Sequence, residues 1–213
     1  ELEIRCLDEP ARRRLYGDEA LFIFDPNDPR NRPDPIEHSA ALITWPIYPA
    51  SLQRLFEQSF GPGLRQSEQR TLTGQWKQAI SLCLDQRQLC SHCGQETFPA
   101  ADAPSTCWSC GTPLPAPLRL RLPHGLVSAA AGNELQPHHF DPLVGESIRE
   151  PLARLVAHPS DPTLLGLQNL STSRWSGRTT SGQSIELDPG KTCNLAALQQ
   201  LDSSAGAILV LRP

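Results

Sequence analysis

The sequence lacks methionine, any long apolar run and a basic excess. None of its 213 residues is Met, and because a complete translation product usually starts with Met, we expect a fragment of a longer protein. No segment reaches the roughly 18–20 consecutive apolar residues of a membrane span, and residues 1–17 lack the apolar core of a signal peptide. These absences predict that the chain has no membrane partner.

The charge balance disfavours a nucleic-acid partner. The chain has 19 Lys and Arg against 23 Asp and Glu, a formal net charge of −4. A protein surface that follows a phosphate backbone usually carries a basic excess or stripe, so we expect no nucleic acid among the partners. A nucleic-acid-binding zinc ribbon stays open as a third hypothesis, and it would require a basic face on the folded surface.

Several motifs of nucleotide-binding and hydrolytic sites are also missing. The sequence contains no G-x-G-x-x-G, no Walker A loop, no G-x-S-x-G and no H-E-x-x-H. The acidic, Pro-rich loop with Asp25, Asp28, Asp34 and Glu37 is typical of a solvated turn. The residues alone therefore predict no catalytic and no cofactor-binding residue in this chain.

Three regions of different composition divide the chain. Hydrophobic residues make up 38 % and charged residues 20 %, which is enough apolar material for a folded core. Residues 1–88 are helical in pattern, residues 89–118 hold four clustered cysteines, and residues 119–213 have the pattern of short strands and turns. We therefore predict an α+β multi-domain chain with these three domains.

Two amphipathic helices are predicted in the first region. Residues 51–60 place apolar side chains on one face and are followed by Gly61 and Gly63, which stop the helix. Residues 71–89 show a second stripe, with Thr73 as the expected N-cap. Residues 22–35 begin apolar and continue into Asp, Asn and Pro turns, so most of this segment is expected to be loop. The two stripes are Leu52, Leu55, Phe56 and Phe60, and Trp76, Ala79, Ile80, Cys83 and Leu84.

Short strands are predicted in the last region. Apolar stretches lie at residues 118–122, 152–157, 184–187 and 207–211, and turn signals such as HPSDP, TSGQ and DPGK separate them. This density of short strands and turns predicts a small β-sandwich or barrel.

The strongest motif is CSHCG…CWSCG over residues 90–111. Two Cys-x-x-Cys pairs separated by thirteen residues can supply four thiolates to one tetrahedral zinc ion, with Cys90, Cys93, Cys107 and Cys110 as the ligands. The alternatives are two redox dithiols, which would need a thioredoxin-like βαβ context that is absent, and two vicinal disulfide loops. Such tight pairs do not form a secreted disulfide framework, so we expect a reducing, cytoplasmic compartment.

A zinc site with four thiolate ligands is closed, so we expect it to be structural rather than catalytic. Gly94 and Gly111 follow the two pairs, and we expect them to turn tightly and leave amides free to donate to sulfur. Phe98 and Trp108 are expected to cover the sulfurs or, alternatively, to contact a neighbouring domain. His92, inside the first pair, is expected to be exposed.

The remaining histidines and cysteines are interpreted as structural. His138 and His139 are adjacent, and adjacent side chains of an extended segment point in opposite directions. One buried and one exposed histidine is therefore expected rather than a metal pair. Cys83 is expected to be a small buried hydrophobe, and the same interpretation covers Cys6 and Cys193.

Longer stretches are similar to one known family. They are LYGDEALFIFDPNDPRNRPDPIEHSAALITWPIYPASLQRLFEQSFGPGL (15–64), Arg70 with Trp76, the two cysteine pairs, and later pieces such as HHFD and DPGK. Together they resemble the C-terminal part of a bacterial Ser/Thr protein kinase of the tellurite-resistance-associated group. In that group a kinase, a metal-dependent protein phosphatase and a von Willebrand A protein occur together. The resemblance implies the last two as partners.

The resemblance also implies roles for single residues and for the parent protein. In protein kinases an Arg shortly before the last C-lobe helix pairs with the Glu of the A-P-E motif, and Arg70 matches that place by spacing; the alternative is a surface Arg. The family's Gly-rich loop, β3 Lys, H-R-D and D-F-G elements would lie upstream of residue 1. The parent enzyme would thus transfer the γ-phosphoryl group of ATP, with Mg²⁺, to protein Ser or Thr, while this chain alone is inactive.

The tail of such kinases is similar in pattern to a forkhead-associated β-sandwich, with NLSTSRW…GQSIELDPGK resembling its later strands. Phosphothreonine recognition would need Arg and Ser on apical loops, and Ser171, Arg174 and Arg178 are available. The alternative is a degenerate sandwich that serves as an interaction surface. For the whole chain, the competing hypothesis is a stand-alone zinc-ribbon and β-sandwich adaptor for protein–protein interaction.

Overall fold

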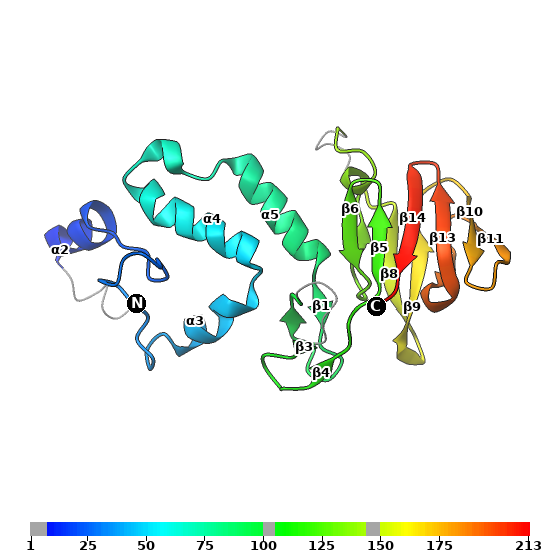
Figure 1. Ribbon diagram of the computed structural model, residues 1–213, viewed down its shortest axis with the longest axis horizontal. Helices are drawn as coiled ribbons and strands as arrows, with labels where there is room; N and C mark the ends of the chain where they lie inside the picture. The colour runs from blue at the N-terminus through cyan, green and yellow to red at the C-terminus, as the bar shows by residue number, and fades with distance from the viewer. Residues whose placement is uncertain (1–7, 100–104, 144–149) are drawn as a thin grey trace. The chain divides into compact units, whose positions relative to one another are not determined.

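The computed structural model describes residues 8–99, 105–143 and 150–213 and combines helices with antiparallel sheets (Figure 1). The chain divides into two compact units, residues 1–83 and 84–213. The cysteine pairs and the β-strands both fall in the second unit. The expectation of a mixed helix-and-sheet chain with a four-cysteine cluster is confirmed, while the division into domains 1–88, 89–118 and 119–213 stays a prediction.

The first unit is built from short helices joined by turns. Asp8 caps the first helix, where its Oδ1 accepts a hydrogen bond from the Ala11 amide at 2.8 Å. Residues 22–35 form turns and irregular structure, as the Pro-rich sequence predicts. The helices are α2 (Glu9–Arg13), the π-turn η1 (Arg14–Asp18), α3 (Ser39–Thr44), α4 (Ala50–Phe60) and α5 (Thr73–Asp85), and the 3₁₀ turns are η2 (Trp45–Ile47), η3 (Pro62–Leu64) and η4 (Ser67–Gln69).

Both predicted helices form, as α4 and α5, although α5 ends at Asp85 rather than at residue 89. Their predicted apolar stripes are only partly buried, because Phe60, Ile80 and Leu84 are exposed. Their inner faces pack around an aromatic cluster. Trp45 stacks on Phe24 with ring centroids 4.6 Å apart, and Phe56 meets Trp76 edge to face at 4.8 Å. Cys83 is buried, as expected. The cluster consists of Phe22, Phe24, Trp45, Phe56, Phe60 and Trp76.

The second unit begins with two small β-hairpins that carry the cysteines. Strand β1 (Gln88–Leu89) pairs with β2 (Glu96–Thr97), and β3 (Ser105–Thr106) pairs with β4 (Pro113–Leu114). Each strand is only two residues long. Such short hairpins need something besides backbone pairing to hold them.

Two larger antiparallel sheets form a β-sandwich in the rest of this unit. One has the order β11-β10-β13-β14-β5-β6, and the other has the order β12-β9-β8-β7. Figure 1 shows the C-terminal strand β14 lying between β5 and β13. The strands are β5 (Arg119–Leu122), β6 (Gly125–Ser128), β7 (Glu134–Leu135), β8 (Ala153–His158), β9 (Asp161–Asn169), β10 (Trp175–Thr179), β11 (Ser184–Leu187), β12 (Thr192–Asn194), β13 (Leu198–Ser203) and β14 (Gly206–Leu211), with 3₁₀ turns η5 (Pro137–His139) and η6 (Leu195–Ala197).

The core of the sandwich follows the two-residue alternation of its strands. In β5, Leu120 and Leu122 are buried while Arg121 is exposed, and in β14, Ile208 and Val210 are buried. The four predicted strand segments are confirmed as β5, β8, β11 and β14. The buried core comprises Leu120, Leu122, Val127, Ala129, Leu135, Phe140, Ala153, Leu155, Leu167, Trp175, Leu187, Leu195, Leu198, Leu201, Ile208 and Val210.

Candidate metal centre

The four cysteines lie on two turns of nearly identical backbone structure. In the first turn, the Cys90 amide donates to Gln95 O at 2.9 Å and the Gly94 amide donates to Cys90 O at 2.8 Å. In the second, the Cys107 amide donates to Thr112 O at 2.9 Å, and the Gly111 amide donates to Cys107 O at 2.9 Å. The repeated pattern folds each Cys-x-x-Cys pair so that both sulfurs face one point.

The glycines turn as predicted, but their amides do not bond to sulfur. Gly94 and Gly111 have φ of 73° and 72°, a left-handed conformation that glycine adopts without strain. Their N–H groups donate to cysteine carbonyl oxygens instead. The residues after them, Gln95 and Thr112, supply the backbone hydrogen bonds to Cys93 and Cys110. Amides therefore donate to sulfur in both turns, as predicted, but the donors are the residues after the glycines rather than the glycines themselves.

The sulfur positions fit a tetrahedral metal. Cys90 Sγ lies 3.7 Å from Cys110 Sγ, and Cys93 Sγ lies 3.6 Å from Cys107 Sγ. A regular tetrahedron with metal–sulfur distances of about 2.3 Å has sulfurs about 3.8 Å apart. Disulfide sulfurs would be about 2.05 Å apart, and the four cysteines are free. The four Sγ atoms lie within 4.8 Å of one another and could hold a metal ion.

The protonation of the sulfurs shows why a cation suits this cluster. Hydrogen bonds from the side chain and then the backbone of Thr112 lower the pKa of Cys110 to about 6. For Cys93, the Gln95 backbone hydrogen bond lowers the pKa, but partial desolvation of this exposed thiol and the thiols of Cys110, Cys107 and Cys90 raise it to about 12 overall. Neighbouring thiolates repel one another, so all four sulfurs can ionise together only around a positive ion.

The residues around the cysteines connect the two hairpins. Trp108 is 38 % exposed and its Nε1 donates to Glu96 O at 2.9 Å, so it links the second cysteine turn to strand β2. His92 is exposed, as expected. Cys90, Cys107 and Leu114 form a small buried cluster of their own. We call the two cysteine hairpins, residues 88–97 and 105–114, the ribbon. These few contacts leave a bound metal as the main candidate for stabilising it.

Arg87 joins the ribbon to the β-sandwich. Its Nη1 donates to Glu96 of β2 at 3.1 Å, and its Nη2 donates to Asn133 Oδ1, also at 3.1 Å. Asn133 is 4 % exposed, and its Nδ2 donates back to Arg87 O and to Ser128 O. Sequence reasoning missed this junction because its partners are 46 residues apart.

A second cluster near the sandwich has the residue types of a metal site. Ligand atoms of Asp85, His138 and His139 lie within 4.8 Å of one another. His139 Nε2 is 3.1 Å from both carboxylate oxygens of Asp85, and the Gln136 amide donates to His139 Nδ1 at 3.0 Å. Since a backbone N–H can only donate, Nδ1 carries no proton, and Nε2 donates its own proton to Asp85. Nε2 is therefore a hydrogen-bond donor here rather than a metal ligand.

The histidine prediction was right in outcome and wrong in reason. His139 is 1 % exposed and His138 is exposed. The segment is not extended, however, but forms the 3₁₀ turn η5, and the two rings lie side by side with centroids 4.1 Å apart. Of the other cysteines, Cys193 is half-buried against the sandwich core, and Cys6 lies outside the described residues.

The residues considered for phosphothreonine recognition do not form one site. Arg174 donates to Asp188 at 2.6 Å and to Glu186 at 2.7 Å, so its charge is already balanced by two carboxylates. Ser171 Oγ donates to Asn169 Oδ1 at 2.8 Å. Arg178 lies within strand β10, away from the loop that carries the other two. A phosphate group there would have to displace the acidic partners of Arg174.

The first unit contains an apolar groove and an arginine, Arg70, of which one side-chain nitrogen forms a hydrogen bond within the unit. The groove has a volume of about 450 Å³ and includes Trp45, Phe56, Trp76 and the 48 %-exposed Ile80. Arg70 Nε donates to Gly63 O at 2.8 Å, and its two terminal nitrogens have no partner among the described residues. The unit thus presents both an apolar and a cationic contact surface.

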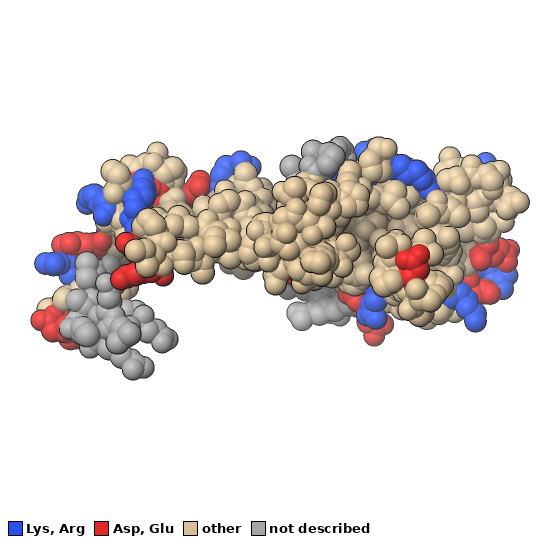
Figure 2. All heavy atoms as spheres, turned by 90° about the horizontal axis from the view of Figure 1, so that it is seen from below, with Lys and Arg blue, Asp and Glu red and all other residues tan. Residues whose placement is uncertain are grey.

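On the face drawn in Figure 2, the described Lys and Arg side chains are interspersed with Asp and Glu. None of the helices in the described part of the chain has the length and apolar character needed to cross a bilayer.

Comparisons of the chain with protein-family models, with characterised proteins and with solved structures found no match.

Proposed function

We propose that this chain is a regulatory and structural C-terminal portion of a Ser/Thr protein kinase, and that Cys90, Cys93, Cys107 and Cys110 hold a structural zinc ion. The observation that carries the zinc part of the proposal is the set of four converging sulfurs, and the kinase part rests on the sequence resemblance. Four protein thiolates fill a tetrahedral coordination sphere and leave no position for water or substrate. Zinc in this site would hold the two hairpins together and would take no part in a reaction.

The first unit supports the kinase part of the proposal. Its groove leaves aromatic and aliphatic side chains in contact with solvent, which a C-lobe could cover with its other helices. Arg70 stands just before α5, and its two terminal nitrogens have no partner among the residues that the structure describes, so they can donate to a carboxylate such as the Glu of an A-P-E motif. In the parent enzyme, ATP and Mg²⁺ would bind outside this chain, and the phosphatase and von Willebrand A protein would be its partners.

The two-sheet antiparallel sandwich supports a forkhead-associated-like third part. Its six-stranded and four-stranded sheets enclose one core, which is the architecture that the resemblance implies. Because Arg174 is paired with Glu186 and Asp188, we propose a protein-interaction surface rather than phosphothreonine recognition at that loop.

A stand-alone adaptor is the second candidate, and one observation favours it. The ribbon and the sandwich belong to one compact unit, residues 84–213, and Arg87 bonds to both. Such a module could dock a partner without any kinase lobe.

The coding sequence upstream of residue 1 distinguishes the kinase proposal from the adaptor proposal. We expect the reading frame upstream of residue 1 to encode H-R-D and D-F-G elements, and the longer product to transfer the γ-phosphoryl group of ATP to Ser or Thr of a general acceptor protein. The matched control is the same product with the H-R-D Asp changed to Asn. A stop codon directly upstream, or an upstream frame without these elements, would contradict the kinase proposal and leave the adaptor.

A further inference from the structure

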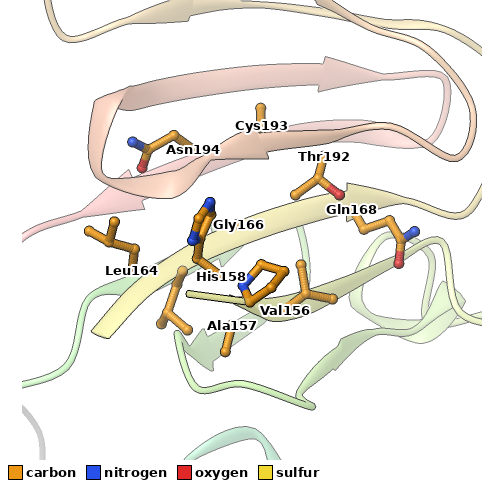
Figure 3. A pocket seen from close by; sticks show the side chains of 11 residues that line it. Val156, Ala157, His158, Leu164, Gly166, Gln168, Thr192, Cys193 and Asn194 are labelled. Carbon is orange, nitrogen blue, oxygen red and sulfur yellow. The ribbon is translucent and has the colours of Figure 1, made fainter. Parts of the chain in front are cut away.

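A pocket of about 470 Å³ lies over the four-stranded sheet, at the end formed by strands β8, β9 and β12 (Figure 3). This volume is in the range of ligand sites, about 300–1,000 Å³. The pocket is separate from the cysteine cluster and from the loop that carries Ser171 and Arg174, since none of those residues lines it. Neither the zinc proposal nor the kinase proposal uses it.

Gly166 lies in the wall of the pocket, where a neighbouring side chain covers it. Gly166 of β9 sits directly between Val156 of β8 and Asn194 of β12 in the strand register. Leu155 and Leu167 point into the core, so this row lies on the outer face of the sheet. A Cβ at position 166 would collide with the Thr192 methyl group. Glycine therefore leaves room for this methyl group, which lines the pocket together with Val156.

The polar groups at the rim are held in fixed donor and acceptor roles. The Ser160 amide donates to His158 Nδ1 at 3.4 Å, which leaves the Nε2–H of a neutral His158 as a donor. The Ala196 amide donates to Asn194 Oδ1 at 2.9 Å, which leaves the Asn194 Nδ2 group as a second donor. Gln168 Nε2 donates to Gly190 O at 3.4 Å, so its Oε1 is left as an acceptor.

The rest of the lining is apolar and uncharged. Val156, Ala157 and Leu165 contribute aliphatic surface, and Leu164 is 43 % exposed at one end. Figure 3 shows Gln168 at the opposite end from Leu164, with His158 and Gly166 between them. None of the described residues that line the pocket is Asp, Glu, Lys or Arg, so nothing there would balance a charged ligand.

This combination matches the peptide group, which has one C=O acceptor and one N–H donor at fixed spacing. We propose that the pocket binds a neutral, extended peptide segment. An aliphatic side chain would pack against Val156 and Leu164, while the peptide backbone would accept hydrogen bonds from His158 and Asn194 and donate one to Gln168. Because β12 is the edge of its sheet, such a segment can approach from the side.

The test is a titration of the ¹⁵N-labelled 213-residue chain with the capped peptide acetyl-Ala-Leu-Ala-amide, followed by NMR. We expect saturable shifts at the amides of Gly166, Thr192 and Asn194. Asn194→Asp keeps the oxygen that caps Ala196 but removes the donor, so it should weaken binding about tenfold. Leu164→Lys, at an exposed position, should also weaken binding without disturbing the core.

Matched controls make the outcome decisive. Arg121→Ala, on the six-stranded sheet, should leave the affinity unchanged. The peptides acetyl-Ala-Glu-Ala-amide and acetyl-Ala-Lys-Ala-amide should bind more weakly than the leucine peptide. The proposal is overturned by the absence of saturable shifts at the solubility limit, by equal binding of the charged peptides, or by shifts confined to other surfaces.

Discussion

At the scale of single residues, the four cysteines are chemically unequal before any metal binds. Cys90 and Cys107 are 2 % exposed, whereas Cys93 and Cys110 are exposed. The buried pair is fixed by the hairpins, and the exposed pair closes the site from the solvent side. In the proposed zinc site each sulfur would be one quarter of a closed coordination sphere, so loss of any one sulfur should destabilise the whole ribbon.

Cys93→Ser should lower zinc affinity by more than about 100-fold, because it removes a ligand rather than an outer-shell partner. The ribbon should also lose order, since zinc-binding energy in such a site is also folding energy. Competition with a chromophoric chelator measures the affinity. His92→Ser, at the exposed neighbouring position, is the matched control and should bind as the unchanged protein does. Equal zinc affinities of the two variants would contradict the assignment of four thiolate ligands.

In a short labelling pulse directly after chelation, while the second cysteine turn is still folded, one cysteine of the ribbon should react faster than the other three. Because Thr112 lowers the pKa of Cys110 to about 6, this sulfur is largely thiolate at pH 7 and should react first with iodoacetamide. Its rate should fall as the pH drops through about 6, where the thiolate is protonated. Cys93, whose pKa is about 12, should react slowly throughout. Mass spectrometry of timed digests gives the order, and faster alkylation of Cys93 would contradict it.

At the scale of elements, the sequence was informative where the pattern is local. The apolar spacing of residues 51–60 predicts α4, and the turn signals around residues 184–187 predict β11, because both depend on neighbours in the chain. Strands β9 and β10 contain Gly166 and Gly177, which weaken a strand pattern. Their pairing across the sheets decides their conformation, and pairing over long sequence distances cannot be read from periodicity.

The same limit explains the outcome for the candidate sites. The spacing of the cysteine pairs predicts the cluster, since each pair is one tight turn. The hydrogen bond between Asp85 and His139 joins residues that are 54 positions apart in the sequence, and no sequence motif predicts it. The sequence suggests Arg174 as a phosphate ligand because it does not show that Glu186 of β11 and Asp188, just after that strand, accept hydrogen bonds from it.

The contact between Asp85 and His139 should stabilise the second unit. His139→Ala leaves a cavity and removes the hydrogen-bond partner of a largely buried carboxylate, which we expect to cost about 2–3 kcal/mol of unfolding free energy. Urea unfolding measures the change. His138→Ala, at the exposed neighbouring position, should cost distinctly less. Equal losses for both variants would show that the hydrogen bond to Asp85 contributes little.

Chelation should affect the hairpins and spare the sandwich. Strands β1 to β4 have two residues each, and their buried cluster has only three residues, so we expect the ribbon to depend on the proposed metal. With chelator, the amides of Gly94 and Gly111 should lose hydrogen-exchange protection, while those of Leu120 and Ile208 in the sandwich core keep theirs. Loss of protection in both places would mean that the junction at Arg87 transmits the unfolding.

At the scale of the whole molecule, the chain consists of a helical unit that carries an apolar groove and a second unit in which Arg87 bonds to both the ribbon and the sandwich. The proposed role in a kinase requires that the first unit packs against the remaining helices of a kinase C-lobe. The proposed zinc does not depend on it, because all four sulfurs belong to residues 84–213. The metal is therefore the claim that the present chain can test alone.

The most direct measurement is the metal content of the purified chain by elemental analysis, combined with thiol titration before and after chelation. The account predicts one zinc ion per chain and four additional reactive thiols once the zinc is removed. A chain that contains no metal, with all four cysteines already reactive or oxidised, would contradict the closed site. That result would favour the alternative that the two Cys-x-x-Cys pairs are redox dithiols.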